Sequence, residues 1–412
     1  MSTTTPPLPV QGSQQDNPAA AQDHPRTVML MLNIGHALDH LFLLIFATAV
    51  GAIALDFGLE RWEDLMPYGV GAFFLFGLGS MPSGRLGDLW GRRQMMLVFF
   101  FGLAIAAFLT AMAQNPWQLA AGLTLIGAFA SIYHPVGIPM LVQRASRPGA
   151  VIGINGLAGN LGVAGAALLT GFLVQWLGWR SAFIVPGLVS LACGVVFALV
   201  CEPQGVAPGR SRKPPQIVLP RRQLARALLV MTAAAITGSL LFNFTTNGNT
   251  QLLTERFDGL VNDPALIGLL LAIVYTLASL SQIVVGRLID RMPLKPLYLS
   301  LVLAQVPWLV LAALTTGWWL FVALVGVMVC IFGCIPFTDA MIVKYVDDSV
   351  RSRVAGMRLA VSLGVSSLAV WLLGPVVKAS SFTSLFLAMA GISICTAAIV
   401  LLLPPDAAPP HT

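Results

Sequence analysis

Three ionisable side chains lie in the middle of the first long apolar segment, residues 28–55. His36, Asp39 and His40 are spaced i, i+3 and i+4, so they share one face of a helix. Inside a membrane such groups are costly unless they face water or a partner. Carboxylates beside imidazoles are typical of proton relays, which makes Asp39 our predicted proton carrier. The alternative is a fixed ion pair with His36 or His40 that only holds the helix in place.

His134 is the fourth candidate for proton coupling, and it precedes Pro135 in a later apolar segment. Its imidazole could accept a proton or bind an anionic group of a substrate. Equally, the ring could hydrogen-bond a backbone carbonyl that Pro135 leaves without its N–H partner. Unpaired polar groups in lipid are costly, so other polar residues of the apolar segments are expected to contact a substrate. These are Asn33, Tyr133, Asn155, Asn243, Asn247, Gln251 and Tyr275.

A charged stretch, Gly84–Arg93, separates two apolar segments and predicts a tight turn at a membrane surface. A shorter copy begins at Gly286, 202 residues later, and Gly35 and Gly238 are 203 residues apart in a chain of 412. The second half of the chain is therefore predicted to be a duplicate of the first. The predicted gate and hairpin residues are Gly84, Arg85, Asp88, Gly91, Arg92, Arg93, Asp290, Arg291, Asp339, Lys344 and Arg358.

Two ion pairs are predicted within this set. Asp88 is expected to hold a cytosolic gate closed by pairing with an arginine or with the positive N-terminal end of the helix at 351–377. In the alternative interpretation, the hairpin charges only anchor the turn among lipid headgroups. Asp339 and Lys344 form either a second gate pair or a plain surface salt bridge.

The composition predicts an all-α membrane protein. Charged residues make up 10% of the chain, against about 25% in a soluble domain, and hydrophobic residues make up 57%. A membrane-spanning helix needs about 20 mostly apolar residues. The segments that qualify form two sets of six, which are 28–55, 65–88, 94–113, 117–143, 149–176 and 180–201, then 223–253, 264–290, 294–315, 317–343, 351–377 and 380–403.

The distribution of positive charge predicts the orientation. With residue 1 in the cytosol, all but four of the 23 Lys and Arg residues lie in cytosolic loops or at cytosolic helix ends. This bias predicts a multi-pass protein of the cytoplasmic (inner) membrane with both termini in the cytosol. The net charge of +6 is then a signal of topology and does not indicate nucleic-acid binding. The predicted division is a disordered tail at 1–26, six-helix bundles at 27–201 and 223–404, a linker at 202–222 and a tail at 405–412.

Several classes of function find no support in the sequence. No Gly-x-x-x-x-Gly-Lys-[Ser/Thr] loop is present, so ATP is not expected to drive the protein directly. No hydrolase triad is recognisable, and we predict neither enzymatic activity nor a cofactor. Cys330 and Cys334 share a helix face, but without a nearby His they are expected to pack in the core rather than bind a metal. No metal site is predicted, and the fold needs no partner subunit to enclose a cavity, which favours a monomer.

The parallel repeat, the central basic linker and the charged hairpin resemble the major facilitator superfamily over essentially the whole chain. The superfamily's hairpin motif is similar to Gly84, Leu86, Asp88, Gly91, Arg92 and Arg93, with Leu89 in place of the usual basic residue. The resemblance implies two six-helix bundles whose helices one, four, seven and ten line a central cavity. It therefore implies that Asp39 and His134 face that cavity.

A narrower likeness is to the fosmidomycin-resistance branch of drug exporters. It rests on His36 with a nearby carboxylate, on Tyr133-His134-Pro135 and on residues 159–162; Gly165-Ala166 replaces the Gly-Pro pair that antiporters often carry. We therefore predict a proton-coupled secondary transporter that works by alternating access and exports a small amphipathic or anionic molecule in exchange for protons. The alternatives are a proton symporter or uniporter for metabolite uptake and, from another class, a non-transporting membrane scaffold or sensor.

Overall fold

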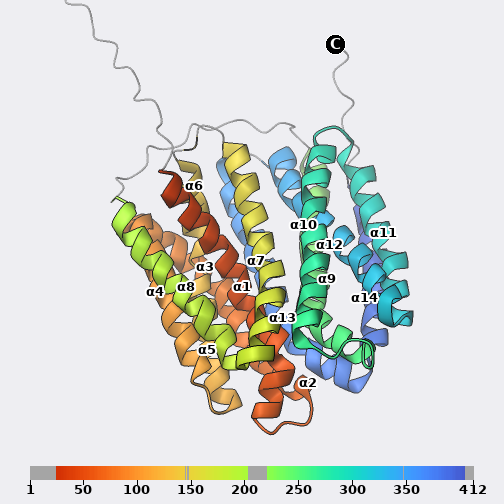
Figure 1. Ribbon diagram of the computed structural model, residues 1–412. Helices are drawn as coiled ribbons and strands as arrows, with labels where there is room; N and C mark the ends of the chain where they lie inside the picture. The colour runs from red at the N-terminus through yellow and green to blue at the C-terminus, as the bar shows by residue number, and fades with distance from the viewer. Residues whose placement is uncertain (1–24, 144, 146–147, 203–219, 347, 404–412) are drawn as a thin grey trace, which may run out of the picture.

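The computed structural model describes residues 25–143, 145, 148–202, 220–346 and 348–403, and no strand occurs among them. Figure 1 shows the helices running roughly parallel in one bundle. The first half contains α1 (Arg26–Asp56), α2 (Trp62–Leu65), η1 (Met66–Gly69), α3 (Val70–Trp90), α4 (Arg92–Ala111), α5 (Pro116–Ala130), η2 (Tyr133–Gly137), α6 (Ile138–Gln143), α7 (Pro148–Leu177) and α8 (Trp179–Val200). The second half contains α9 (Arg221–Arg256), α10 (Pro264–Ile289), α11 (Leu294–Leu314), α12 (Gly317–Tyr345), α13 (Asp348–Ala379) and α14 (Phe382–Val400).

The short elements continue into neighbouring helices, and we call each resulting continuous helical segment a rod. Each half contains six rods, in agreement with the six helices predicted. The segments Trp62–Trp90 and Pro116–Gln143 each form one rod. Over the described residues, eleven helices are long and apolar enough to cross a membrane, and the twelfth rod, α13, contributes the shorter apolar stretch Gly364–Ala379. Large apolar side chains such as Leu188, Leu199 and Val284 are exposed. Exposed apolar side chains suit rods that are surrounded by lipid.

The boundaries differ from the prediction in a few places. Helix α9 begins at Arg221, inside the predicted linker, because Pro220 precedes it in an extended conformation and starts the helix there. Helix α13 begins three residues early, at Asp348. Helix α1 begins at Arg26, the last residue of the predicted first tail. Residues 1–24 of that tail, residues 203–219 of the linker and the predicted tail at 405–412 lie outside the described residues.

The turns between rods form where the sequence supplies suitable residues. Gly91 adopts φ = 96° between α3 and α4, in the region that disfavours side chains, which explains its place in the charged hairpin. Asn115 caps α5 by accepting hydrogen bonds from the backbone N–H groups of residues 117 and 118, and Pro116 occupies the first helical position. Asp263 and Pro264 repeat this arrangement at the start of α10.

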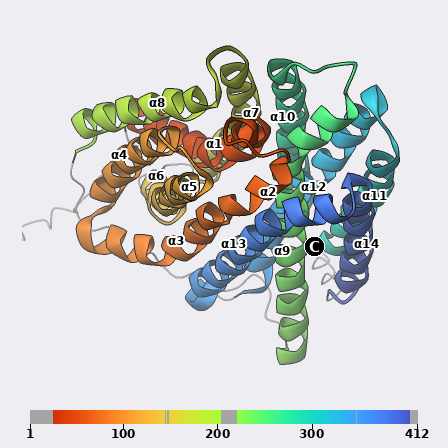
Figure 2. The ribbon, with the colours of Figure 1, turned by 90° about the horizontal axis from the view of Figure 1, so that it is seen from below.

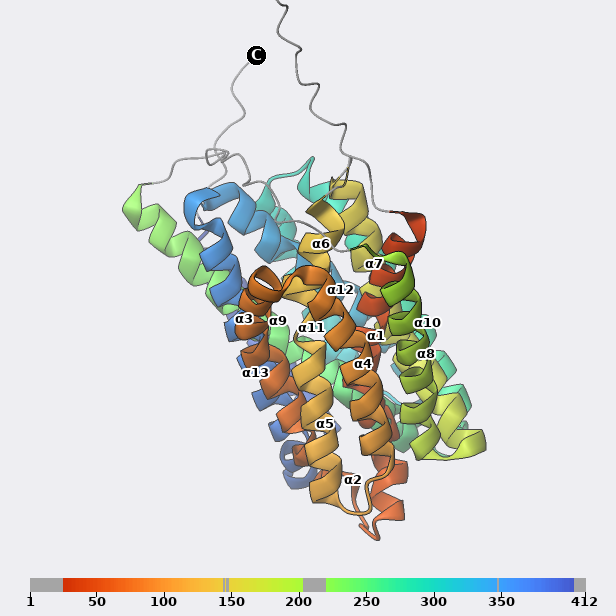
Figure 3. The ribbon, with the colours of Figure 1, turned by 90° about the vertical axis from the view of Figure 1, so that its left-hand side faces the viewer.

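The two halves lie side by side, with α3 beside α13 and α7 beside α10 (Figures 2 and 3). We call the end that carries Gly84–Arg93 the hairpin end and the opposite end the distal end. Among the described residues, the ion pair and the ring stacking that join the two halves both lie at the distal end. Lys378 pairs with Asp64, and the ring centroids of Trp62 and Phe382 stand 6.0 Å apart.

Weakening the distal ion pair is expected to have a small but reversible effect. Both side chains are almost half exposed, and such pairs contribute about 0–1 kcal/mol. Lys378→Glu should shift the balance between distal-closed and distal-open forms by about twofold to fivefold. Distances between spin labels placed across the distal end would measure that balance. The charge swap Asp64→Lys with Lys378→Glu should restore it, and a swap that behaves like the single change would contradict this assignment.

Glycines allow several rods to touch backbone to backbone. A Cβ on Gly162 of α7 would stand 2.2 Å from the carbonyl oxygen of Ala37, and one on Gly171 would stand 2.4 Å from that of Pro264 in the other half. Small residues of this kind let helices approach closely in membranes. Glycines recur at every third position of α7 from Gly153 to Gly165, but a Cβ on Gly153 or Gly156 would meet no described atom within 4 Å. Close packing is thus confined to the part of α7 beyond Gly156.

Candidate functional site

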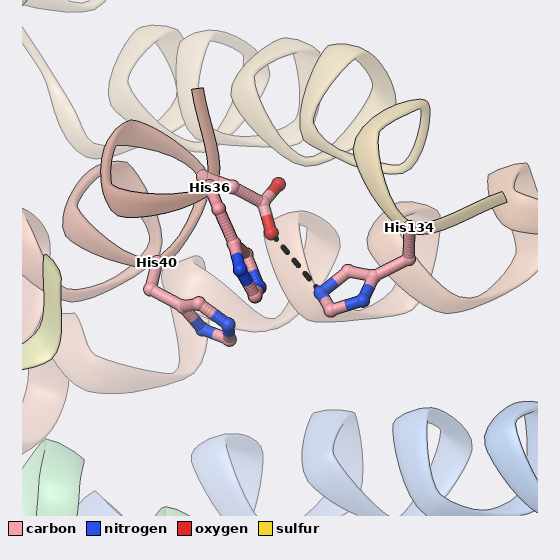
Figure 4. A group of neighbouring side chains, drawn as sticks. His36, His40 and His134 are labelled. Atoms are coloured by element: carbon pink, nitrogen blue, oxygen red, sulfur yellow. Dashed lines mark ion pairs between the residues drawn. The ribbon is translucent and has the colours of Figure 1, made fainter. Parts of the chain in front are cut away.

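The four residues predicted to couple protons meet in one cluster between α1 and η2. One donor atom from each of His36, Asp39, His40 and His134 lies within 4.8 Å of the others. The spacing on α1 brings the first three together, and the fold adds His134 from a rod almost a hundred residues later. Figure 4 shows His36, His40 and His134 gathered in one group.

Asp39 carries the negative charge of this cluster. Its side chain is fully buried, and His134 Nε2 lies 3.3 Å from Asp39 Oδ2, as the dashed line in Figure 4 marks. That contact is close enough for an ion pair but poorly aligned for a hydrogen bond. Neither carboxylate oxygen therefore receives a hydrogen bond from a described residue. A buried carboxylate without donors is destabilised unless a cation or proton neutralises it.

His36 is held in a fixed orientation. Its Nδ1 lies 2.7 Å from the backbone carbonyl oxygen of Asn155, which can only accept, so Nδ1 carries the proton. The ring stacks on Tyr133 at 4.8 Å, and a Cβ on Gly159 would come within 2.6 Å of it. In the neutral ring, Nε2 then bears a lone pair that is buried and has no described partner.

The position of His134 depends on a local irregularity of its rod. Pro135 removes one N–H from the helix, and residues Tyr133–Gly137 form a single π-helical turn. This turn directs Tyr133 and His134 toward α1, where the Tyr133 hydroxyl donates to the carbonyl oxygen of Leu32 at 2.7 Å. The alternative prediction, in which the His134 ring bonds a freed carbonyl, is not what the structure shows, because its Nε2 faces Asp39.

A cavity of about 230 Å³ lies between the two halves beside this cluster. Its wall on the first half contains His40 and apolar side chains that include Phe73 and Phe76. The second half contributes polar groups, among them Asn243 and Arg358. Neither Asp39 nor His134 lines the cavity, contrary to the expectation from the family resemblance, and the Asp39 side chain is fully buried. His40 joins the cluster to the cavity, and the ring centroids of His40 and His134 are 5.6 Å apart.

The predicted substrate residues fall into three groups. Asn243 lines the cavity and donates to the Ser366 hydroxyl at 2.8 Å. Asn155, Asn33 and Tyr133 form a network behind the cluster, in which the Asn155 amide donates to Tyr133 Oη at 2.7 Å and to Asn33 Oδ1 at 3.0 Å. These three residues brace α1, η2 and α7 against one another.

The remaining three lie away from this cavity. Tyr275 is buried against Phe332 and accepts from Asn249 at 3.4 Å, so its role in this structure is packing. Asn247 donates to the backbone of its own helix, and its buried Oδ1 has no described partner. Gln251 lines a second cavity of about 380 Å³ near the distal end, between α1, α7, α9 and α10.

The predicted gate residues do not act as one unit. Asp339 pairs with Arg358 of α13 at 2.8 Å, rather than with Lys344 on its own helix. Lys344 lies over the ring of Tyr345, at 5.5 Å from its centroid. Residues five positions apart on one helix point in different directions around its axis, whereas α13 brings Arg358 directly alongside α12. Arg358 also donates to Thr338 and lines the cavity, a role that the sequence analysis missed.

At the hairpin end, Arg92 and Arg93 hold neighbouring rods together. Arg92 donates to Gln143 at 2.8 Å, and Arg93 donates to the carbonyl oxygens of Ala198 and Cys201. Asp88 is exposed and forms no ion pair with a described residue. The side chains at the start of α13, which Asp88 was predicted to meet, lie outside the described residues, so that pairing stays a prediction. Other exposed or partly exposed members of the set are Gly84, Arg85, Gly91, Asp290 and Arg291.

Among the described residues, this cluster is also the group of side chains whose donor atoms could hold a metal ion. The sequence analysis predicted no metal site, because His134 lies too far along the chain for its spacing to reveal the fourth ligand. Cys330 and Cys334 are free thiols of the second half; Cys330 is buried, and Cys334 is partly buried and lines the cavity.

Comparison with known proteins shows which family has this architecture. The model of the Major Facilitator Superfamily matches residues 32–261 and 257–412. A multidrug resistance protein MdtG from Dickeya zeae is 27% identical over 79% of this chain and 80% of its own length. A probable actinorhodin transporter from Streptomyces coelicolor is 30% identical over 45% of this chain, and that match spans 32% of the relative's length.

Solved structures show the same fold. A bacterial homologue of the human lysosomal transporter Spinster, in an inward-facing and occupied conformation, superposes with a TM-score of 0.70 at 15% identity, over 91% of this chain and 94% of that one. Twin six-helix halves, a cavity between them and a family match over most of the sequence agree with one another. The chain is a multi-pass membrane transporter rather than an enzyme, and it belongs to the Major Facilitator Superfamily.

Proposed function

We propose that this protein exports a small amphipathic or anionic molecule across the cytoplasmic membrane in exchange for protons. The observation that carries the proposal is the cavity between the halves, whose wall leads through His40 to a buried carboxylate. Transport by members of this fold proceeds by rocking of the two halves around a central site. The proposed proton site lies on one half, next to a substrate cavity that both halves share. This arrangement suits the coupling of proton flux to substrate flux.

The hairpin end is assigned to the cytosol, which also sets both termini there. This assignment is supported by the excess of Lys and Arg on that side. The described links between the halves then lie at the outer surface, so the conformation corresponds to one closed to the outside. A coupling proton would bind Asp39 in exchange for its ion pair with His134, which changes how the first half packs at the cavity wall.

The substrate cavity favours an amphipathic ligand. Phenylalanines line much of one side, and Arg358 is the strongest charge in a described lining that contains no carboxylate. The Arg358 guanidinium is mostly buried and could pair with an acidic group of the substrate, since Asp339 is largely exposed to water. Relatives described as a multidrug resistance protein and a putative metabolite transport protein support a small-molecule substrate.

The direction of transport can be tested in inside-out vesicles. Compounds are first selected by thermal shift of the purified protein against a panel of amphipathic antibiotics and aromatic acids. With an acidic vesicle interior, an exporter should accumulate the selected compound, and collapse of the pH gradient should release it. Accumulation only under the opposite gradient would replace export with uptake by symport. Flux that does not depend on the pH gradient would indicate a uniporter. A lack of any flux would favour a non-transporting membrane scaffold or sensor.

A further inference from the structure

The cluster of His36, Asp39, His40 and His134 has the composition and geometry of a metal site. Three imidazoles and one carboxylate offer the donors that zinc and its neighbours among divalent transition metals prefer. Most ionisable groups in a protein interior are matched by a partner, yet both oxygens of Asp39 and Nε2 of His36 are buried without a hydrogen bond. These atoms belong to a cluster whose donor atoms lie within 4.8 Å of one another, and a bound cation would satisfy them.

The distances suit a small ion. Bonds of about 2.0–2.2 Å from zinc to nitrogen and oxygen place the donors of a tetrahedral site roughly 3.4 Å apart. His134 Nε2 and Asp39 Oδ2 already stand 3.3 Å apart, and all four donors lie within 4.8 Å of one another. Small rotations of the imidazoles would close the remaining gap. Three of the ligands share one helix face, and η2 supplies the fourth.

The surroundings of the cluster also match a metal site. Histidine ligands usually donate their second ring N–H to a carbonyl or carboxylate, which fixes the tautomer and aims the other nitrogen at the metal. His36 does this through Nδ1 to the Asn155 carbonyl. Tyr133 stacks on the same ring and fixes its plane. An entry path exists as well, because His40 is partly exposed on the cavity wall.

We propose that this cluster binds one divalent transition-metal ion, with His36 Nε2, an Asp39 oxygen and the imidazoles of His40 and His134 as ligands. The charge of a divalent ion neutralises Asp39 and leaves the site with one net positive charge. The inference goes beyond the proposed function, since metal binding needs no transport. The two proposals overlap in one respect only, because the metal ion would occupy the residues assigned to the coupling proton.

Binding can be measured on the full chain, purified without a histidine tag and treated with a chelator. Titration with Zn²⁺ by calorimetry should show one ion per chain, and Co²⁺ should give the visible spectrum of a tetrahedral site with nitrogen and oxygen ligands. Asp39→Asn and His36→Gln should each weaken binding by at least about 10–100-fold, the loss caused even by changes behind the ligands. His40→Gln provides a third variant at the cavity wall if either of these fails to fold.

The chain supplies its own controls. His24 and His411 are the other two histidines of the sequence, and His24→Gln with His411→Gln should leave Zn²⁺ affinity unchanged. Cys330→Ser with Cys334→Ser should also leave it unchanged, which excludes a thiolate site. The proposal fails if the wild-type protein binds no stoichiometric ion, or if Asp39→Asn binds as tightly as the wild type. Proton-driven flux in chelator-containing buffer is measured in parallel, so loss of either property alone identifies which proposal is wrong.

Discussion

Replacement of Asp39 by asparagine should abolish proton-driven accumulation of substrate in inside-out vesicles, to the level of vesicles without the protein. Asparagine keeps the size and polarity of the side chain but cannot carry a negative charge or exchange a proton. The ion pair with His134, which is 3.3 Å long in the structure, would lose its charged partner. Folding should survive, because the exchange removes a fully buried charge that receives no hydrogen bond.

Two comparisons make this result specific. Exchange of labelled substrate at equal pH on both sides needs no net proton movement, so Asp39→Asn should retain it. Asp56→Asn alters another carboxylate of α1, one that is partly exposed and pairs with Arg180 at the distal end, and it should leave accumulation largely intact. Undiminished gradient-driven accumulation by Asp39→Asn would remove this carboxylate from the coupling mechanism.

The largest effect on stability is expected from Gly127→Ala in α5. A Cβ at this position would stand 1.9 Å from the carbonyl oxygen of Ala72 and 2.6 Å from its Cα, so α5 and α3 would have to separate. Backbone atoms cannot rotate away as a side chain can. Overpacking usually costs about 1–3 kcal/mol, and this contact should lie at or above the upper end. Thermal unfolding of the purified protein would show the loss as a lower midpoint.

Gly153→Ala in α7 is the matched control. Nothing lies within 4 Å of a Cβ at Gly153, and alanine favours a helix over glycine by up to about 1 kcal/mol. Its unfolding midpoint should therefore equal or slightly exceed that of the wild type. An unchanged midpoint for Gly127→Ala would mean that α3 and α5 are further apart than the structure indicates.

Much of the fold could be predicted from the sequence, because the length and apolarity of each rod are local properties. The repeat at Gly84 and Gly286 gave the twin halves, and the spacing of His36, Asp39 and His40 gave three members of the cluster. The irregular turns were harder to predict. Pro135 indicated a disturbed helix, but whether it kinks the rod or adds a π turn depends on the packing of Tyr133 against α1.

Long-range pairings could not be predicted from spacing. Asp339 was matched with Lys344 because they are near in sequence, whereas the fold brings Arg358 closer. Tyr275 and Gln251 lie on apolar rods, and the face that each side chain occupies depends on rotation of the rod about its axis, which neighbouring helices determine. Apolar rods have similar residues on all faces, so their sequence contains little information about that rotation.

The repeat bears on how the free energy of ion binding would be transferred to the transported substrate. At the offset of 203 residues that relates Gly35 to Gly238, the counterparts of His36, Asp39 and His40 are Ser239, Phe242 and Asn243, which line the cavity. One copy of this helix face therefore carries ionisable side chains, and the other carries neutral ones. In the proposed mechanism, the ion binds the first face and the cargo contacts the second. Their free energies would then be exchanged mechanically, through the relative tilt of two bodies that diverged from one ancestor.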